Sequence, residues 1–371
     1  MAKTVAIYYQ TAYNTVSSLI KRVLKRRYIL EEFKSKRKGD ILRYAVDDYI
    51  RNPQPITSGS LSKHFTDIST ATLRNELNGL EQMGYLMQLH TSGGRVPTNL
   101  AYRYYVNNIL SNVNSLTAES LQKVKDNYES KSISLISTLS SLAKRLSKVT
   151  NCPTVLVQNG LENLTVVDIK IIPLIQKDGL LLVETVAGII DDNLSLSPDI
   201  DRDACIEASN YLTEHFKGRT IKYMVDNITD VCMRAGAQMY EFKSLIDSVT
   251  DALLNVVKTK LDITNENPSK MLKSITQNEY DDAKDILEFL EDGEEVINSI
   301  SSTDKLDFKI GDENSSDKLK GGMVMTSPIV IDGVNIASLA VVAPKRIDYS
   351  SLATALKFIV GQAENLNKKG D

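Results

Sequence analysis

The feature that most constrains the fold is a change of hydrophobic period at Gly84. Across residues 41–83, apolar residues recur at helical spacing in three short segments. After Gly84, residues 85–89 have the composition of a strand, and residues 91–95 have that of a tight glycine turn before a further helix. Three short helices followed by a glycine-tipped hairpin are the order of a winged helix-turn-helix, a DNA-binding architecture.

The predicted ends of these helices coincide with residues that favour helix ends. The Pro53–Pro55 segment ends the first helix, because proline lacks a backbone N–H and clashes with the preceding turn. Thr57 or Ser58 can cap the second helix and Ser69 the third, through side-chain oxygens that accept from the first turn. Gly84 then stands where a left-handed residue is usual, so the third helix is expected to stop there.

Charge is distributed unevenly along the chain. Residues 1–107 hold 16 Lys and Arg against 8 Asp and Glu, a net charge of +8. The remaining residues hold 28 basic and 39 acidic residues, a net charge of −11. A basic head on an acidic body is typical of a nucleic-acid-binding domain joined to a domain with another role, although chance clustering is the simpler alternative.

The third helix has the composition of a recognition helix. Ser69, Thr70 and Thr72 place hydroxyls near its start, where backbone N–H groups also favour phosphate. Arg74 can bind guanine or a phosphate, and Asn75 can bind adenine, with about 1–3 kcal/mol of discrimination for each good bidentate contact. The same residues fit an ordinary solvated helix equally well, and the hairpin that follows favours the DNA-binding interpretation.

The hairpin and the second helix supply the other expected DNA contacts. Arg95 suits a phosphate or the minor groove, because the glycines before it let the backbone lie close to DNA. The remaining predicted contact residues are His90, Thr91 and Ser92 at the turn and Ser58, Ser60 and Lys63 near the second helix.

Beyond the hairpin, strand-like and helix-like patterns alternate. Residues 117–148 predict a long amphipathic helix, and helical spacing returns over residues 202–260 and, after a polar stretch, to about residue 300. A last helix follows residue 350. The predicted strands are residues 154–157, 166–175, 180–186, 194–196, 308–310, 323–331 and 336–342. Strands divided by a helical block suggest one mixed α/β domain that carries an insertion.

Several classes of protein are excluded by what the sequence lacks. No apolar run approaches the roughly 18 residues of a membrane helix, and the start of the chain lacks a secretory pattern, so a cytoplasmic location without membrane contact is expected. The three cysteines are far apart and are expected to be reduced thiols.

Catalytic and metal-binding patterns are also missing. The three histidines lie at no metal spacing and near no nucleophile, and no phosphate loop is present. The carboxylate pairs Asp191–Asp192 and Asp281–Asp282 are better explained as a turn and a helix start. We therefore expect no enzyme activity, no cofactor and no metal.

Two runs of residues carry a family resemblance. The first comprises Ile41-Leu42-Arg43, Asp48-Tyr49-Ile50, Pro55-Ile56-Thr57-Ser58 and the segment from Ser69 to Leu86. The second comprises His90 to Thr98 and Tyr102 to Val106. In order and spacing these runs resemble the HrcA family of heat-inducible transcription repressors. Cys152-Pro153, Val183–Gly188, Gly311–Asn314 and Pro344–Tyr349 follow in family order, so the resemblance spans about residues 38–365.

The resemblance implies an α+β multidomain fold. A winged helix-turn-helix (39–107) would precede a GAF-like α/β domain (108–162 and 266–371), into which a dimerising domain (163–265) is inserted. The two basic clusters before residue 39 indicate a flexible or partly helical basic arm (1–38), which has no counterpart in the family. The resemblance also implies a negative regulator of class I heat-shock chaperone operons. Such a repressor binds double-stranded DNA at an inverted-repeat operator, the CIRCE element, as a homodimer, and the GroE chaperonin maintains its activity. An inverted repeat calls for a two-fold symmetric protein.

Two questions stay open at the level of sequence. The insertion is either all-helical, over about residues 201–302, or runs over residues 163–265. We favour the second because a three-stranded meander with following helices can bury its own apolar face.

The alternative function is a winged-helix regulator that senses a small molecule through its GAF-like domain. A winged helix used only for protein contacts is disfavoured by the charge of +8.

Overall fold

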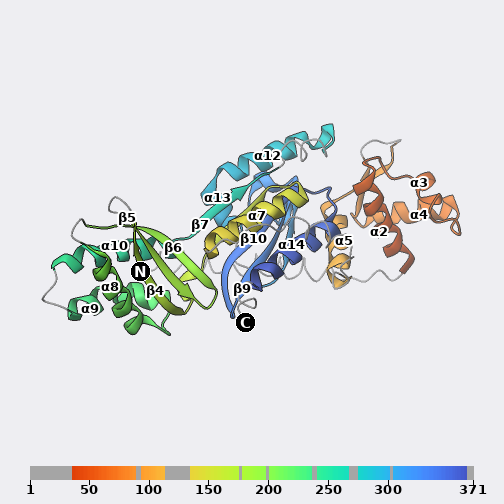
Figure 1. The fold of residues 1–371 in the computed structure, drawn as a ribbon. Helices are drawn as coiled ribbons and strands as arrows, with labels where there is room; N and C mark the ends of the chain where they lie inside the picture. The colour runs from red at the N-terminus through yellow and green to blue at the C-terminus, as the bar shows by residue number, and fades with distance from the viewer. Residues whose placement is uncertain are drawn as a thin grey trace, which may run out of the picture. The chain divides into compact units, whose positions relative to one another are not determined.

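The computed structural model describes residues 36–88, 93–112, 134–174, 178–197, 200–235, 240–266, 275–300 and 304–365 (Figure 1). The chain divides at residue 112 into two compact units. The first unit is small and mostly helical, and the second combines two sheets with flanking helices, so the protein has a mixed α/β fold.

The first unit contains the expected helices and hairpin in the expected order. Its elements are α2 (Lys36–Arg51), α3 (Ser58–Ser62), α4 (Thr70–Gln82), β1 (Leu86–Gln88), β2 (Arg95–Pro97) and α5 (Asn99–Asn112). Leu73, Leu77 and Leu80 of α4 are fully buried, as their spacing predicts. Gly84 follows α4 with a φ of 79°, which confirms the left-handed helix stop.

The starts of α3 and α4 are fixed by the capping residues that the sequence indicated. The Thr57 side chain accepts from the Ser60 backbone N–H at 3.0 Å, and Ser60 Oγ accepts from the Thr57 N–H at 3.1 Å. Ser69 Oγ accepts from the Thr72 N–H at 3.1 Å. These caps satisfy backbone donors that a helix leaves unpaired in its first turn.

The structure describes three residues of the arm predicted over residues 1–38. Helix α2 begins at Lys36, so the last three of those residues are helical, and Lys38 Nζ lies 3.5 Å from a carboxylate oxygen of Glu76 on α4. Residues 1–35 lie outside the described part of the chain.

An antiparallel five-stranded sheet forms the centre of the second unit. Its strand order is β7 (Lys260–Thr264), β3 (Thr154–Gln158), β10 (Val334–Pro344), β9 (Gly322–Ile331) and β8 (Asp307–Ile310). Helices α7 (Leu135–Thr150) and α14 (Tyr349–Glu364) pack together against one face (Figure 1). Helices α12 (Tyr280–Glu291) and α13 (Gly293–Ser299) cover the other.

Successive residues of the central strands point to opposite faces of the sheet, and both faces are covered. Val155, Val157, Ala340 and Val342 cluster with Phe289 of α12 and its apolar neighbours. The residues between them in β3 and β10 are also buried, on the side of α7 and α14. The central strands therefore form near-continuous apolar runs, in keeping with a sheet buried on both faces.

A second, three-stranded antiparallel sheet lies between β3 and β7 in the chain. Its strands are β4 (Val166–Pro173), β5 (Asp178–Thr185) and β6 (Gly188–Ser195), and the helices that follow are α8 (Arg202–Phe216), α9 (Ile221–Ala235) and α10 (Tyr240–Val257). The expected meander with following helices is present. Strand β6 is longer than the predicted run at residues 194–196.

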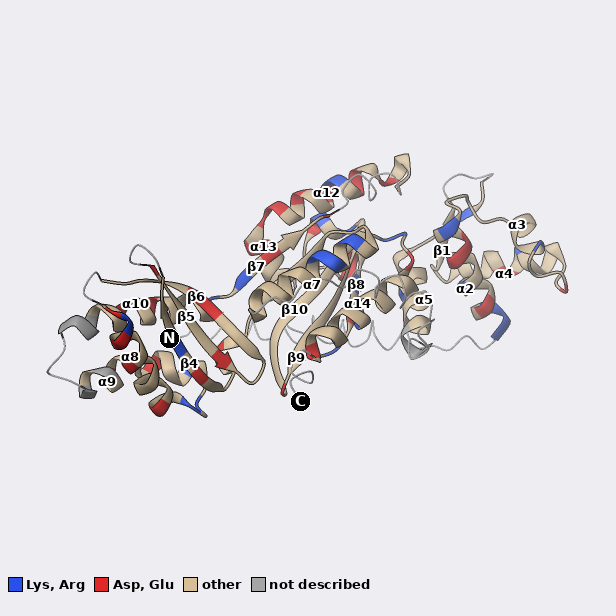
Figure 2. Ribbon diagram, in the orientation of Figure 1, with Lys and Arg blue, Asp and Glu red and all other residues tan. Residues whose placement is uncertain are grey.

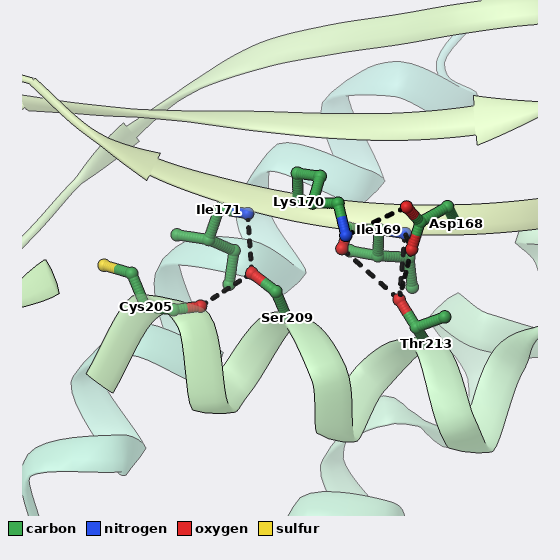
Figure 3. Close-up of polar contacts among 7 residues, drawn as sticks. All are labelled: Asp168, Ile169, Lys170, Ile171, Cys205, Ser209 and Thr213. Atoms are coloured by element: carbon green, nitrogen blue, oxygen red, sulfur yellow. Dashed lines mark hydrogen bonds and ion pairs between the residues drawn. The ribbon is translucent and has the colours of Figure 1, made fainter. Parts of the chain in front are cut away.

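Helix α8 covers the edge strand β4 through side-chain hydroxyls (Figure 3). Ser209 Oγ accepts from the Ile171 N–H at 2.8 Å, and Thr213 Oγ1 accepts from the Ile169 N–H at 3.0 Å. Thr213 also donates to Asp168 at 3.0 Å. Edge strands offer unpaired backbone groups to other chains, so these hydroxyls hinder pairing of β4 with a strand of another chain.

The structure differs from the sequence-based prediction at β7. We expected helix or polar loop near residue 260, but residues 260–264 pair with β3, with Lys260 opposite Gln158 and Thr264 opposite Thr154. Of the long helix predicted over residues 117–148, residues 135–150 are helical and residues 117–133 lie outside the described part. Because β7 belongs to the five-stranded sheet, we propose limits of 159–259 for the insertion, in place of 163–265.

Candidate nucleic-acid interface

Helix α4 presents one apolar and one polar face. Its leucines point into the core, while Thr70, Arg74 and Asn75 are exposed. Among the described residues, neither Arg74 nor Asn75 has a hydrogen bond or ion pair with another side chain. Both side chains are therefore available to an outside partner, as a recognition helix requires.

Hydroxyls at the start of α4 are partly used within the helix. Ser69 Oγ caps the helix and lies 2.9 Å from Thr72 Oγ1, so the two side chains hydrogen-bond each other. The Thr70 side chain is exposed beside them. The expected site residues Ser69, Thr70 and Thr72 are thus together at one helix end, where backbone N–H groups favour an anion.

The residues expected near the second helix are more divided. Lys63 is exposed directly after α3, whereas Ser58 is half-buried. Ser60 is engaged in the capping box with Thr57. Of the expected contacts in this segment, Lys63 is the best placed to meet a phosphate.

Arg95 lies in surroundings that the sequence analysis did not anticipate. We expected it to face DNA, but its Nε donates to Glu81 Oε2 at 2.7 Å and its Nη2 donates to Asn78 Oδ1 at 2.5 Å. Only 11% of its side chain is exposed. The guanidinium is held by α4 and is not free at the surface. His90, Thr91 and Ser92 lie outside the described residues.

Sequence reasoning missed Asn78 and Glu81. They lie three residues apart on α4 and therefore on the same side of that helix, which is a signal for a shared partner. The partner itself is 14 to 17 residues further along the chain, so only the folded hairpin reveals it.

Lys and Arg residues lie on several elements of the first unit (Figure 2). Those classed as exposed in the described part of this unit are Lys36, Arg37, Arg43, Arg51, Lys63 and Arg74. Exposed Lys and Arg side chains attract the phosphate backbone irrespective of sequence.

Gly94 sits where the hairpin crosses the segment before α3. Ile56 and Arg95 exchange backbone hydrogen bonds of 2.7 and 2.9 Å, which adds a short third bridge to the hairpin. A Cβ on Gly94 would lie 2.7 Å from the Ile56 carbonyl oxygen and 2.8 Å from Pro55 backbone. Glycine is therefore required by close backbone approach.

Replacing Gly94 by alanine is expected to destabilise the first unit by about 1–3 kcal/mol, because the backbone must shift to relieve the clash. Gly59→Ala is the matched control: its Cβ would meet only Thr57 Oγ1 at an ordinary 3.7 Å, and alanine favours a helix. Hydrogen exchange of the α4 and β2 amides measures the stability of the first unit in both variants. Equal protection in the two variants would contradict the expectation.

The chain thus joins a helix-and-hairpin unit with an exposed polar helix to a larger α/β unit, and known proteins share this organisation. The family model described as "HrcA protein C terminal domain" matches residues 137–352. The chain belongs to the HrcA family.

Curated relatives are similar over nearly the whole chain. The heat-inducible transcription repressor HrcA of Acetivibrio thermocellus is 27% identical over 88% of this chain and 94% of its own length. That of Bacillus pumilus is 26% identical over 88% of this chain and 95% of its own length. A crystal structure described as that of a hypothetical protein shares the fold, with a TM-score of 0.64 at 19% identity, over 91% of this chain and 99% of that chain.

No described helix combines the length and the apolar character that crossing a membrane requires. The described His, Cys, Asp and Glu side chains form no group of three that could hold a metal ion.

Proposed function

We propose that this protein is a negative transcriptional regulator of heat-shock chaperone operons, and that it acts in the cytoplasm as a dimer on an inverted-repeat operator, the CIRCE element. The observation that carries the proposal is the exposed polar face of α4, with Arg74 and Asn75 outward and the leucines buried. The family relatives bear the name of heat-inducible transcription repressors.

In this proposal the first unit is a winged helix and α4 lies in the major groove. Arg74 and Asn75 contact base edges, and Ser69, Thr70 and Lys63 meet the phosphate backbone. The hairpin β1–β2 is the wing in this proposal, and His90, Thr91 and Ser92 remain proposed DNA contacts from the sequence. Exposed basic residues on this unit support the assignment.

The second unit is proposed to combine a GAF-like domain with an inserted dimerising module. Support comes from the connectivity: the five-stranded sheet is left after β3 and rejoined at β7, and the three-stranded sheet with α8, α9 and α10 lies between. A dimer brings two copies of α4 to the two halves of a palindrome.

Control by the GroE chaperonin is the part of the proposal supported by family membership alone. A chaperonin that sustains the active repressor would lose that capacity when heat supplies unfolded clients. Repression would then lapse while demand for chaperones is high.

A footprint on DNA upstream of the organism's chaperone genes, made with and without chaperonin, tests the proposed function. Two protected half-sites related by two-fold symmetry are expected, separated by whole turns of about 10 base pairs. Chaperonin is expected to raise the fraction of protein that binds. Purified protein that binds no inverted repeat better than random duplex, with or without chaperonin, would refute the proposal.

A further inference from the structure

The Arg95 side chain joins the base of the hairpin to α4. Its guanidinium donates from two different nitrogens to two acceptors, the Glu81 carboxylate at 2.7 Å and the Asn78 amide oxygen at 2.5 Å. The acceptors lie almost one helical turn apart on the C-terminal half of α4. A planar guanidinium can satisfy both at once, which a lysine ammonium does less well.

Burial separates this contact from an ordinary surface ion pair. The Arg95 side chain is 11% exposed and that of Glu81 is 33% exposed. Exposed pairs contribute little because water and salt screen them. The part-buried, charge-assisted bond to Glu81 is stronger than such a pair, and the second bond, to the exposed Asn78, fixes the orientation of the guanidinium.

The backbone of Arg95 is fixed as well as its side chain. Arg95 pairs with Gln88 of β1 and exchanges backbone hydrogen bonds with Ile56. One residue therefore ties three segments together: the recognition helix candidate, the hairpin and the chain that leads into α3.

We propose that Arg95 is a positioning residue for DNA binding: through Asn78 and Glu81 it fixes the hairpin relative to the exposed face of α4. This inference rests on the proposed function. A helix in the major groove and a hairpin over the flanking backbone must engage at the same time. A fixed relation between them removes an ordering cost that binding would otherwise bear.

The effect of a charge change on DNA affinity distinguishes a positioning role of Arg95 from direct contact with phosphate. If Arg95 bound phosphate, then Glu81 would only weaken the attraction to DNA, and its neutralisation by Glu81→Gln would strengthen binding. If Arg95 positions the hairpin, the same substitution weakens binding although the protein becomes less acidic. Asp67→Asn is the matched control, because Asp67 is exposed and the substitution makes the same change of charge.

The experiment compares full-length wild type, Glu81→Gln, Arg95→Lys and Asp67→Asn on a duplex that holds the inverted repeat footprinted by wild type. Affinity is measured over a range of salt concentrations, and circular dichroism melting checks the fold of each variant. We expect about tenfold weaker binding for Glu81→Gln and for Arg95→Lys, as for the loss of a hydrogen bond to a charged group. Asp67→Asn should bind as wild type or slightly better.

A hydroxyl-radical footprint distinguishes positioning from a general loss of fold. We expect Glu81→Gln to lose protection at the outer flank of each half-site, where the hairpin would lie, and to keep protection in the groove under α4. The salt slope should stay at the wild-type value for Arg95→Lys, since charge is retained.

The positioning role would be overturned if Glu81→Gln bound as tightly as Asp67→Asn, or if Arg95→Lys matched wild type. Uniform loss of protection across the half-site, with a lowered melting temperature, would also overturn it in favour of a folding role. Wild type that shows no preference for the repeat over random duplex refutes the proposed function itself, and so is distinguishable from these results.

Discussion

Replacing Arg74 by alanine is expected to lower operator affinity by at least tenfold and to relax the base preference at one position of each half-site. Arg74 is exposed on α4 and has no ion pair with another described residue. A bidentate contact to guanine contributes about 1–3 kcal/mol of discrimination. A symmetric dimer loses that contact twice, so the effect on a full palindrome is larger than on one half-site.

Arg43→Ala on α2 is the matched control for this prediction. Arg43 is an exposed arginine of the same unit, paired with Asp40 at 3.5 Å, and its removal changes the net charge equally. Gel-shift titrations on the palindrome and on single-base variants measure affinity and base preference, and sedimentation checks the oligomeric state. Equal affinity losses for Arg43→Ala and Arg74→Ala would mean that α4 does not read bases.

The second large effect is expected at the ion pair between Arg346 and Glu279, which binds the start of α12 to the chain after β10. Arg346 Nε donates to Glu279 Oε1 at 2.7 Å and Nη2 donates to Oε2 at 2.8 Å. The two side chains are 11% and 16% exposed. Arg346→Met leaves a largely buried carboxylate without its main partner, so a loss of about 3 kcal/mol is expected.

The pH dependence of this pair follows from the pKa of Glu279. Burial alone would raise that pKa, but hydrogen bonds from Arg346 and Thr276 outweigh burial and lower it. A lowered folded-state pKa gives stability that is fully present above the unfolded value of about 4.3 and is lost as the pH falls through the folded value. Wild type should therefore lose stability as the pH falls below about 4.3, and Arg346→Met should lose less.

Urea unfolding at neutral pH and in the acid range, with hydrogen exchange of α12 amides, measures this prediction. Lys320→Met is the control, because Lys320 and Asp317 form an exposed pair whose side chains are 61% and 91% accessible. Exposed pairs contribute about 0–1 kcal/mol. Similar losses in the free energy of unfolding for Lys320→Met and Arg346→Met would show that burial does not strengthen the Arg346–Glu279 pair.

Local signals made the first unit predictable from its sequence. The caps at Thr57 and Ser69, the leucine spacing of α4 and the stop at Gly84 are all set by residues within a few positions of each other. Each of these residues acts only on its own helix end, so the folded structure keeps the helix limits that the sequence predicts. The strand order of the second unit depends on contacts between distant segments, so local sequence signals could not predict it.

Strand β7 and the contacts of Arg95 show why the rest was not predictable. Leu261 and Ile263 alternate over only five residues, a signal too short to oppose the helical spacing before it; pairing with β3 decides the outcome. An arginine beside glycines in a turn has the same sequence signature whether it faces DNA or a carboxylate. The position of Glu81 on α4, known only after folding, decides between them.

Antiparallel pairing of β3 with β7 brings the two ends of the segment between them, residues 159–259, side by side. Gln158, the last residue of β3, stands opposite Lys260, the first residue of β7. Neighbouring strands of this kind can be closed by a turn of two residues. An Asn-Gly turn in place of residues 159–259 is therefore expected to join β3 directly to β7 and to leave the five-stranded sheet intact.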